Sequence, residues 1–342
     1  MMGRHLRCLI LAVAGLALGA GDVHATTHDF YKGKVIRIVV GFAAGGGFDT
    51  YARAIARHMS RHIPGNPTII VENMPGAASL IAANHVYKVA KPDGLSIAHF
   101  IGGLFMLQVF GKPGVEFDSR KFEYLGVPVR DNPTCAFTRA SGITSMEKWF
   151  AAKTPVKIGA VAPGSSTDDV PKLLAAAIGV PLQVVSGYKG TAAVRLAAEG
   201  GEVAGGCWGW ESIRATWRKG IETGEVAVVL QTGPKPASDI ASVPLVTSFA
   251  KTDEARQLIK VGIMDAGAIT RPFVVTPGTP KDRVQLLRKA FLDTLKDPEF
   301  LQEAQKTKLD VDPMSGEELE RTVHALFKHD PAFVAKLKEI LK

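Results

Sequence analysis

The chain has 342 residues, of which 46% are hydrophobic and 22% charged, and its formal net charge is +8 at neutral pH. This length exceeds what one small core needs, so we expect two domains of an ordinary globular protein. The basic residues are scattered and accompany no nucleic-acid-binding motif, which argues against a nucleic acid partner and suits a small anionic ligand.

The first 25 residues have the pattern of a secretory signal peptide. Arg4 and Arg7 precede an apolar run over residues 8–18, which is short for a bilayer-spanning helix. The sequence "VHA" then places small residues before a cleavage point. We therefore expect cleavage near Ala25, export to the periplasm, and a mature chain without a membrane span.

Two cysteines, Cys135 and Cys207, remain after the predicted cleavage. In an oxidising compartment they either form a disulfide or stay as separate buried thiols. The sequence leaves both alternatives open, because it does not report the distance between them. Neither lies in a C-x-x-C motif, so no metal or redox role is predicted.

Strands and helices are predicted to alternate after residue 34. Residues 35–40 are β-branched and nearly continuous, and residues 51–63 carry apolar side chains at i, i+4 spacing. A strand over residues 68–73, a helix over 80–89 and a strand over 95–101 follow. This βαβαβ order predicts a parallel sheet with helices on its faces.

The same unit recurs further along the chain. A strand over residues 156–161 leads through the small-residue loop "APGSSTDD" into a helix over residues 170–178. At an offset of about 118 residues, Gly46 aligns with Gly164, and we expect a β-branched residue at either position to disrupt its loop. The fold class predicted is therefore α/β with two domains, each a mostly parallel sheet flanked by helices.

The three consecutive glycines in "VGFAAGGGFDTY", residues 40–51, raise the question of a ligand. A P-loop would need Lys and Ser or Thr where Gly47 and Phe48 stand, and a Rossmann fingerprint would need glycine at Thr50. Glu72 nevertheless lies where the Rossmann acidic residue belongs. Two interpretations remain: backbone N–H groups at a helix N-terminus that bind one small anion, or a tight turn that binds nothing.

Five stretches, in this order, carry a family resemblance: "FAAGGGFD", "VENMPGAAS", "KPDG", "GYKGT" and "TPGTPKDRVQLLRKAF". Over about residues 30–340 the chain resembles the extracytoplasmic solute receptors of the tripartite tricarboxylate transporter family, the TctC or Bug group. The resemblance implies a monomeric periplasmic receptor of the Venus flytrap type, with a ligand cleft between two domains. The expected divisions are a signal peptide over residues 1–25, domain 1 over 26–130, domain 2 over 131–245, and a return to domain 1 over 246–342.

The resemblance also implies that backbone amides of the two small-residue loops hold a carboxylate. The implied ligand-binding residues are Phe42, Ala43, Gly45, Gly46, Gly47, Phe48, Asp49, Ala77, Ser79, Gly164, Ser165, Ser166, Thr167, Tyr188 and Trp208. The chain departs from the family where Gly41 and Ala43 replace prolines, where Phe48 precedes the aspartate, and where Ala78 and Ser79 replace glycines. These departures concern the rigidity and the lining of the site.

Aromatic residues suggest the ligand class. If Phe48, Trp208 and Trp210 line the cleft, they favour a mono- or dicarboxylate with an apolar or aromatic body over a tricarboxylate. The alternative is that the tryptophans belong to the core of the second domain. Asp49 has two compatible roles, as the N-cap of the first helix and as a polar acceptor facing the ligand.

The sequence gives little support for metal binding or catalysis. His58 and His62 have i, i+4 spacing but lie in a basic segment typical of a solvated helix face. Lys189 fits a turn better than a Schiff base, and Asp168 and Asp169 fit a helix start better than a catalytic pair. No enzyme activity, metal or cofactor is predicted. The predicted function is delivery of a carboxylate to membrane permease subunits; a periplasmic sensor or scavenger, and an exported α/β hydrolase or transferase, remain alternatives.

Overall fold

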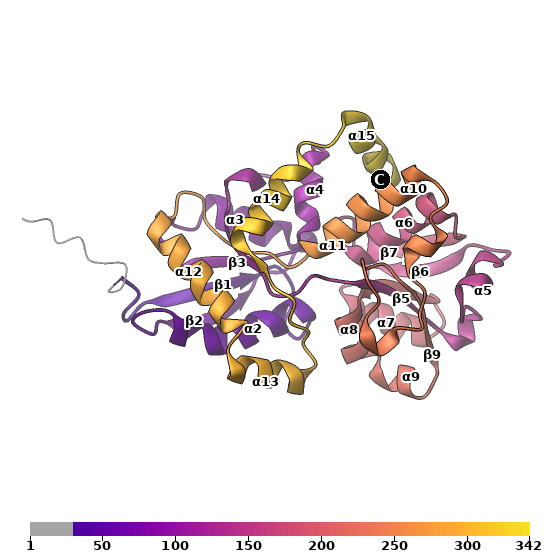
Figure 1. Cartoon of the computed structure of the whole chain (residues 1–342), viewed down its shortest axis with the longest axis horizontal. Helices are drawn as coiled ribbons and strands as arrows, with labels where there is room; N and C mark the ends of the chain where they lie inside the picture. The colour runs from indigo at the N-terminus through magenta and orange to yellow at the C-terminus, as the bar shows by residue number, and fades with distance from the viewer. Residues whose placement is uncertain (1–29) are drawn as a thin grey trace, which may run out of the picture.

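A computed structural model describes residues 30–342 and shows two α/β domains side by side (Figure 1). The predicted signal peptide and its cleavage site lie outside the described residues. Among the helices from residue 30 onward, none combines the length and the apolar character needed to cross a membrane. The predicted two-domain α/β fold is confirmed, but each sheet mixes parallel with antiparallel pairs where mostly parallel sheets were predicted.

The first sheet has six strands in the order β11-β4-β10-β3-β1-β2. Its parallel part is the predicted βαβαβ unit, in which β1 pairs with both β2 and β3, and antiparallel strands extend it beyond β3. The strands are β1 (Val35–Val40), β2 (Thr68–Asn73), β3 (Ser96–His99), β4 (Glu123–Val127), β10 (Phe273–Val275) and β11 (Met314–Ser315). Its helices are α2 (Gly47–Met59), α3 (Leu80–Lys88), α4 (Gly103–Val109), α12 (Lys281–Thr294), α13 (Pro298–Thr307) and α14 (Gly316–Leu326).

The second sheet has five strands in the order β7-β6-β8-β5-β9, with β6 parallel to β7 and β8 and with β5 antiparallel to β8 and β9. The strands are β5 (Pro133–Thr138), β6 (Val156–Ala160), β7 (Leu182–Ser186), β8 (Gly205–Gly209) and β9 (Val226–Gln231). The helices that follow or precede them are α5 (Met146–Phe150), α6 (Ser166–Ile178), α7 (Thr191–Glu199), α8 (Trp210–Thr216) and α9 (Arg218–Glu222).

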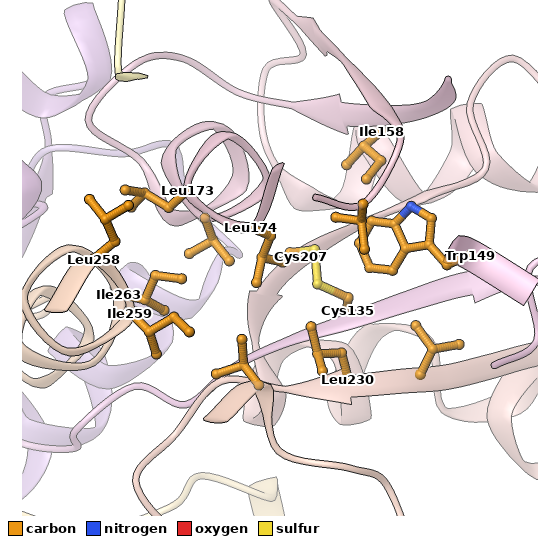
Figure 2. Packing of buried hydrophobic residues seen from close by; sticks show 14 of the residues in the cluster. Cys135, Trp149, Ile158, Leu173, Leu174, Cys207, Leu230, Leu258, Ile259 and Ile263 are labelled. Atoms are coloured by element: carbon orange, nitrogen blue, oxygen red, sulfur yellow. A yellow bond between two sulfur atoms is a disulfide. The ribbon is translucent and has the colours of Figure 1, made fainter. Parts of the chain in front are cut away.

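Cys135 and Cys207 form a disulfide between β5 and β8, where the two residues lie directly opposite each other in the antiparallel register. Figure 2 shows the bond inside the core of the second domain, beside Trp149 and Leu230. Both cysteines are fully buried. Of the two alternatives that the sequence left open, the structure has the disulfide.

The return to the first domain comes later than residue 246. Helix α10 (Asp253–Gln257) and the π-helix Leu258–Asp265 pack on α6, and Leu258 and Ile259 share the disulfide's core cluster (Figure 2). The apolar run "LIKVGIM" covers α6, so it is part of the hydrophobic core of the second domain. After α11 (Ala266–Ala268) the chain enters β10, and the last helix, α15 (Pro331–Ile340), again packs against α6 (Figure 1).

The chain therefore crosses between the domains three times, at about residues 128–132, 269–272 and 327–330. The first two crossings are tied together, because the backbone N–H of Asp131 donates to the carbonyl of Gly267 at 3.2 Å. The first crossing is also held by a backbone bond from Arg130 to Asp312, also at 3.2 Å. We refer to these three connections as the hinge region.

Candidate functional site

The first glycine loop joins β1 to α2. Helix α2 begins at Gly47 with Gly46 as its N-cap, and Gly45 has a φ of +84°, which favours glycine. Asp49 is therefore inside the first turn rather than at the N-cap. Its carboxylate accepts the N–H of Gly45 at 2.9 Å and also accepts from Arg53 and Asn73.

Asp49 holds the loop rather than facing outward. Its side chain is buried, and although burial alone would favour the neutral acid, the hydrogen bonds from Arg53, Gly45 and Asn73 hold the pKa of Asp49 below its usual value. The first N–H groups of α2 have no partner inside the helix. Because Ala43 and Gly46 are exposed, these donors form a helix N-terminus of the kind that binds anions.

The second loop, between β6 and α6, is built in the same way. Gly164 has a φ of +83°, Ser165 is the N-cap, and Asp169 accepts the N–H of Gly164 at 3.0 Å. Gly45 thus corresponds to Gly164, one residue away from the match that the sequence suggested. The hydroxyl of Ser165 donates to the loop carbonyl of Ala162 and lies 2.7 Å from the hydroxyl of Thr167.

Thr167 accepts the backbone N–H of Val161 at 2.9 Å, so its hydroxyl, like that of Ser165, serves the loop itself. Ser166 is only partly buried and lines a small cavity of about 30 Å³ between the domains. The same cavity is lined by Gly103, Gly164, Asp169 and Thr270. The second loop therefore faces the first domain at this point.

Two glycines of the first domain make this contact. A Cβ on Gly103 would lie 1.9 Å from the carbonyl oxygen of Gly164, and a Cβ on Gly102 would lie 1.9 Å from that of Ile269. No larger side chain fits at either position without moving a backbone. The N-terminus of α4 thus rests directly on the second loop and on the hinge.

Ala77 and Ser79 lie beside the first loop, in the short turn Ala77–Ser79 before α3. Ala77, Ala78 and Ser79 all have positive φ, at 45°, 50° and 72°, so the two family glycines are replaced where glycine would be least strained. Ser79 is buried and its hydroxyl accepts the N–H of Ile101 at 3.0 Å. A Cβ on Gly41 would lie 2.2 Å from that of Ser79, which explains glycine there.

The aromatic hypothesis needs correction at Trp208. This side chain is 2% exposed and stacks on Trp217 with ring centroids 5.7 Å apart, in the core that β8 shares with α7 and α8. It is a core residue of the second domain. Trp210 is also buried and donates its indole N–H to Asp239 at 2.9 Å.

Phe42 and Phe48 remain near the first loop. Their rings pack 4.5 Å apart, and Phe48 also contacts His99 at 4.9 Å between centroids. Tyr188 lies in the second domain, where its hydroxyl donates to Glu202 at 2.6 Å, and this bond raises the pKa of Tyr188 to about 12. Tyr188 thus has a protein partner already.

The remaining candidates have structural partners. His58 bonds to Glu303 at 2.8 Å and His62 to Asp297 at 2.9 Å, so both face carboxylates near α13. From residue 30 to the C-terminus, no group of three or more His, Cys, Asp or Glu is placed to hold a metal ion. Asp168 forms an i, i+4 ion pair with Lys172 at 2.6 Å.

Sequence reasoning missed a buried ion cluster next to the first loop. The guanidinium of Arg271, in the second crossing, bonds to Asp131 at 2.8 Å and to Glu211 at the start of α8. All three side chains are buried. The available signal was a charged residue inside an apolar stretch, as in "AITRPFVV" for Arg271.

A larger hollow than the cavity at Ser166 lies elsewhere. A groove of about 890 Å³ runs between α8 and α9 of one domain and α13 of the other. Arg214 spans it, with ion pairs to Asp239 at 2.8 Å and to Asp310 at 2.6 Å. Neither small-residue loop lines this groove.

A family model described as "Tripartite tricarboxylate transporter family receptor" matches residues 51–338. The chain belongs to this family. The family consists of solute receptors rather than enzymes, so the predicted identity is confirmed. The "UPF0065 protein in gbd 5'region" of Cupriavidus necator is 27% identical to the receptor, over 96% of this chain and 95% of its own length.

Solved structures share the receptor's fold. The periplasmic binding protein BugD is 23% identical, with a TM-score of 0.72 over 91% of this chain and 98% of its own. A Rhodopseudomonas palustris protein solved with adipate is 21% identical, with a TM-score of 0.71 over 90% and 97%. MatC from the same species, with bound malate, is 18% identical, with a TM-score of 0.68 over 90% and 99%.

Asp169 predicts a pH effect on the receptor's stability. Burial raises its pKa to about 7, although the N–H of Gly164 opposes the shift. The native state therefore binds more protons than the unfolded state, and Asp169 destabilises the fold increasingly as pH rises from about 4 to about 7. We expect Asp169→Asn, which keeps an acceptor for Gly164, to raise the free energy of unfolding by about 1–3 kcal/mol at pH ~8 and to change it little at pH ~4.

Urea denaturation at the two pH values measures this difference. The control is Asp253→Asn, which changes a first-turn aspartate whose side chain is 99% exposed, and it should show no such pH dependence. An equal effect of Asp169→Asn at both pH values would contradict the raised pKa.

Proposed function

We propose that the receptor is a periplasmic protein that binds a small carboxylate between its two small-residue loops and delivers it to the membrane subunits of a tripartite tricarboxylate transporter. The observation that carries the proposal is the duplicated loop. In each domain a glycine with φ near +84° precedes a helix N-terminus, and an aspartate inside the helix fixes that glycine. Two helix N-termini supply donors for anionic oxygens.

The ligand class follows from what surrounds the loops. Phe42 and Phe48 provide apolar surface beside the first loop, while the hydroxyls of Ser165 and Thr167 are bonded within the second. A tricarboxylate would need several more polar partners once desolvated. We therefore propose a mono- or dicarboxylate with an apolar body. The similar proteins solved with malate and with adipate each hold a dicarboxylate, and adipate has an apolar body.

Gly45 offers the sharpest test. The sequence repeat aligned Gly46 with Gly164, but Gly46 has a φ of −86°, and the nearest atom to a Cβ added at Gly46 would lie 3.8 Å away. Gly45 is the residue with a positive φ, a conformation that would be strained for any residue with a Cβ. We expect Gly45→Ala to weaken carboxylate binding by about tenfold or more, because the donors of the loop lose their arrangement, and Gly46→Ala, the matched control, to change it less than about threefold.

The measurement is titration calorimetry after a thermal-shift screen of mono-, di- and tricarboxylates that includes adipate and malate. A ligand at about 100 times its Kd should stabilise the fold by about 2.7 kcal/mol. Small-angle scattering should show compaction with the same ligand. A screen without a hit would contradict the ligand class, and an unchanged Kd in Gly45→Ala would place the site elsewhere.

A further inference from the structure

The buried ion cluster lies where the hinge and the first glycine loop meet. Asp131 belongs to the first crossing, Arg271 to the second, and Glu211 to the first turn of α8 in the second domain. The Nε of Arg271 donates to Asp131 at 2.8 Å, and its Nη2 donates to Glu211. One side chain thus links both crossings to a helix of the second domain.

The same guanidinium packs against α2 of the first domain. It lies 4.8 Å from the ring centroid of Phe48 and 5.2 Å from that of Tyr51. Its Nη1 would be 3.1 Å from a Cβ on Gly47. In the part of the chain that the structure describes, this Nη1 is buried and has no hydrogen-bond partner. A cation with an unused donor therefore lies directly beneath the helix N-terminus that we propose binds an anion.

The cluster has an uneven charge, because one guanidinium faces two carboxylates. Burial and the charge of Asp131 raise the pKa of Glu211 to about 7, against the attraction of Arg271. Asp310 adds a further negative charge nearby, although it pairs with Arg214, and the phenol of Tyr51 faces the same cluster from α2. The ionised cluster thus places a net negative charge below the loop.

We propose that Arg271 couples the protonation of Glu211 to the first glycine loop, so that binding of a carboxylate at residues 45–47 is accompanied by uptake of a proton at Glu211. This inference rests on the proposed function. With Glu211 neutral, the charge of Arg271 is balanced by Asp131 alone, and the cluster no longer repels an anion at the loop. Carboxylate binding and proton binding then favour each other by the same factor.

A test without ligand follows the amide signals of residues 45–47 by NMR between about pH 5 and about pH 9. We expect them to titrate with a midpoint near 7 in the wild type and to lose this transition in Glu211→Gln. Asp169→Asn is the matched control, since it removes the other carboxyl group whose pKa is about 7, and the transition should persist in it. Flat signals in the wild type, or a transition that survives Glu211→Gln, would overturn the proposal.

Asp131→Asn tests the same coupling if Glu211→Gln does not fold, which thermal unfolding will show. Removing the charge of Asp131 should move the midpoint to lower pH, because that charge helps to raise the pKa of Glu211. An unchanged midpoint would count against the cluster as the source of the transition.

Calorimetry with adipate as the probe measures the consequence for binding. We expect the wild-type Kd to be about five- to tenfold lower at pH ~6 than at pH ~8, and Glu211→Gln to abolish this ratio. Adipate binding that is independent of pH would overturn the coupling and leave the proposed function standing. If adipate does not bind, the acid with the largest thermal shift in the screen replaces it as the probe. A screen without a hit would count against the proposed function alone, and the NMR titration would still decide the coupling.

Discussion

Replacing Arg271 by methionine is expected to lower the free energy of unfolding by about 3–5 kcal/mol at pH ~8, because the change leaves Asp131 and Glu211 buried without their cation. The loss should shrink at pH ~5. Without the guanidinium the pKa of Glu211 rises further, because Arg271 opposes its shift in the wild type. The native state of the variant then takes up a proton that the unfolded chain does not hold, and acid stabilises the variant relative to the wild type.

Urea denaturation at both pH values checks this expectation. Arg214→Met is the matched control, because Arg214 also holds two carboxylates across the domains but its side chain is 29% exposed, and its loss should cost about 1 kcal/mol. Adding Glu211→Gln to Arg271→Met should restore part of the stability. A loss no greater than that of Arg214→Met would show that the cluster is unimportant for the fold.

Removing the disulfide is the second large effect. The bond between Cys135 and Cys207 closes a sequence separation of 72 residues, and a loop of that length corresponds to about 4 kcal/mol of unfolded-state entropy. We expect Cys135→Ala combined with Cys207→Ala to lower the free energy of unfolding by about 3–5 kcal/mol. The smaller alanine side chains add a modest packing loss in a fully buried cluster.

Denaturation with and without a reductant separates the two contributions. The reductant should destabilise the wild type by most of this amount and leave the double variant unchanged. If the wild type unfolds at the same urea concentration in both conditions, the bond is either absent from the protein in solution or without effect on its stability.

Local features of the structure were predictable, and distant ones were not. The loops at Gly45 and Gly164 were predictable because a strand, a run of small residues and an apolar helix face are contiguous in the sequence. The position of Trp208 was not predictable. Strand β8 is covered on both faces, and an aromatic residue next to a cysteine does not reveal which of the two core clusters it joins. The cluster of Asp131, Glu211 and Arg271 assembles from three segments that only the fold brings together.

It was also not predictable from the sequence that the apolar segment after residue 257 completes the second domain. Leu258 and Val261 have i, i+3 spacing, and Ile259 and Ile263 have i, i+4 spacing, as in any buried helix. The segment belongs to the second domain because it covers an apolar face of α6 that would otherwise be exposed. Whether such a helix joins the sheet before it or the sheet after it depends on contacts between elements, which periodicity does not report.

The position of β10 has a consequence for how the chain folds. This strand lies between β3 and β4 in the first sheet, yet it follows the strands of the second domain in the sequence. The first domain therefore stays incomplete at its centre until about residue 275 is available, and closing it requires contacts between segments well over a hundred residues apart. Such non-local closure is slow. During synthesis the amino-terminal portion should remain open longest, a delay that would suit the export to the periplasm that we propose.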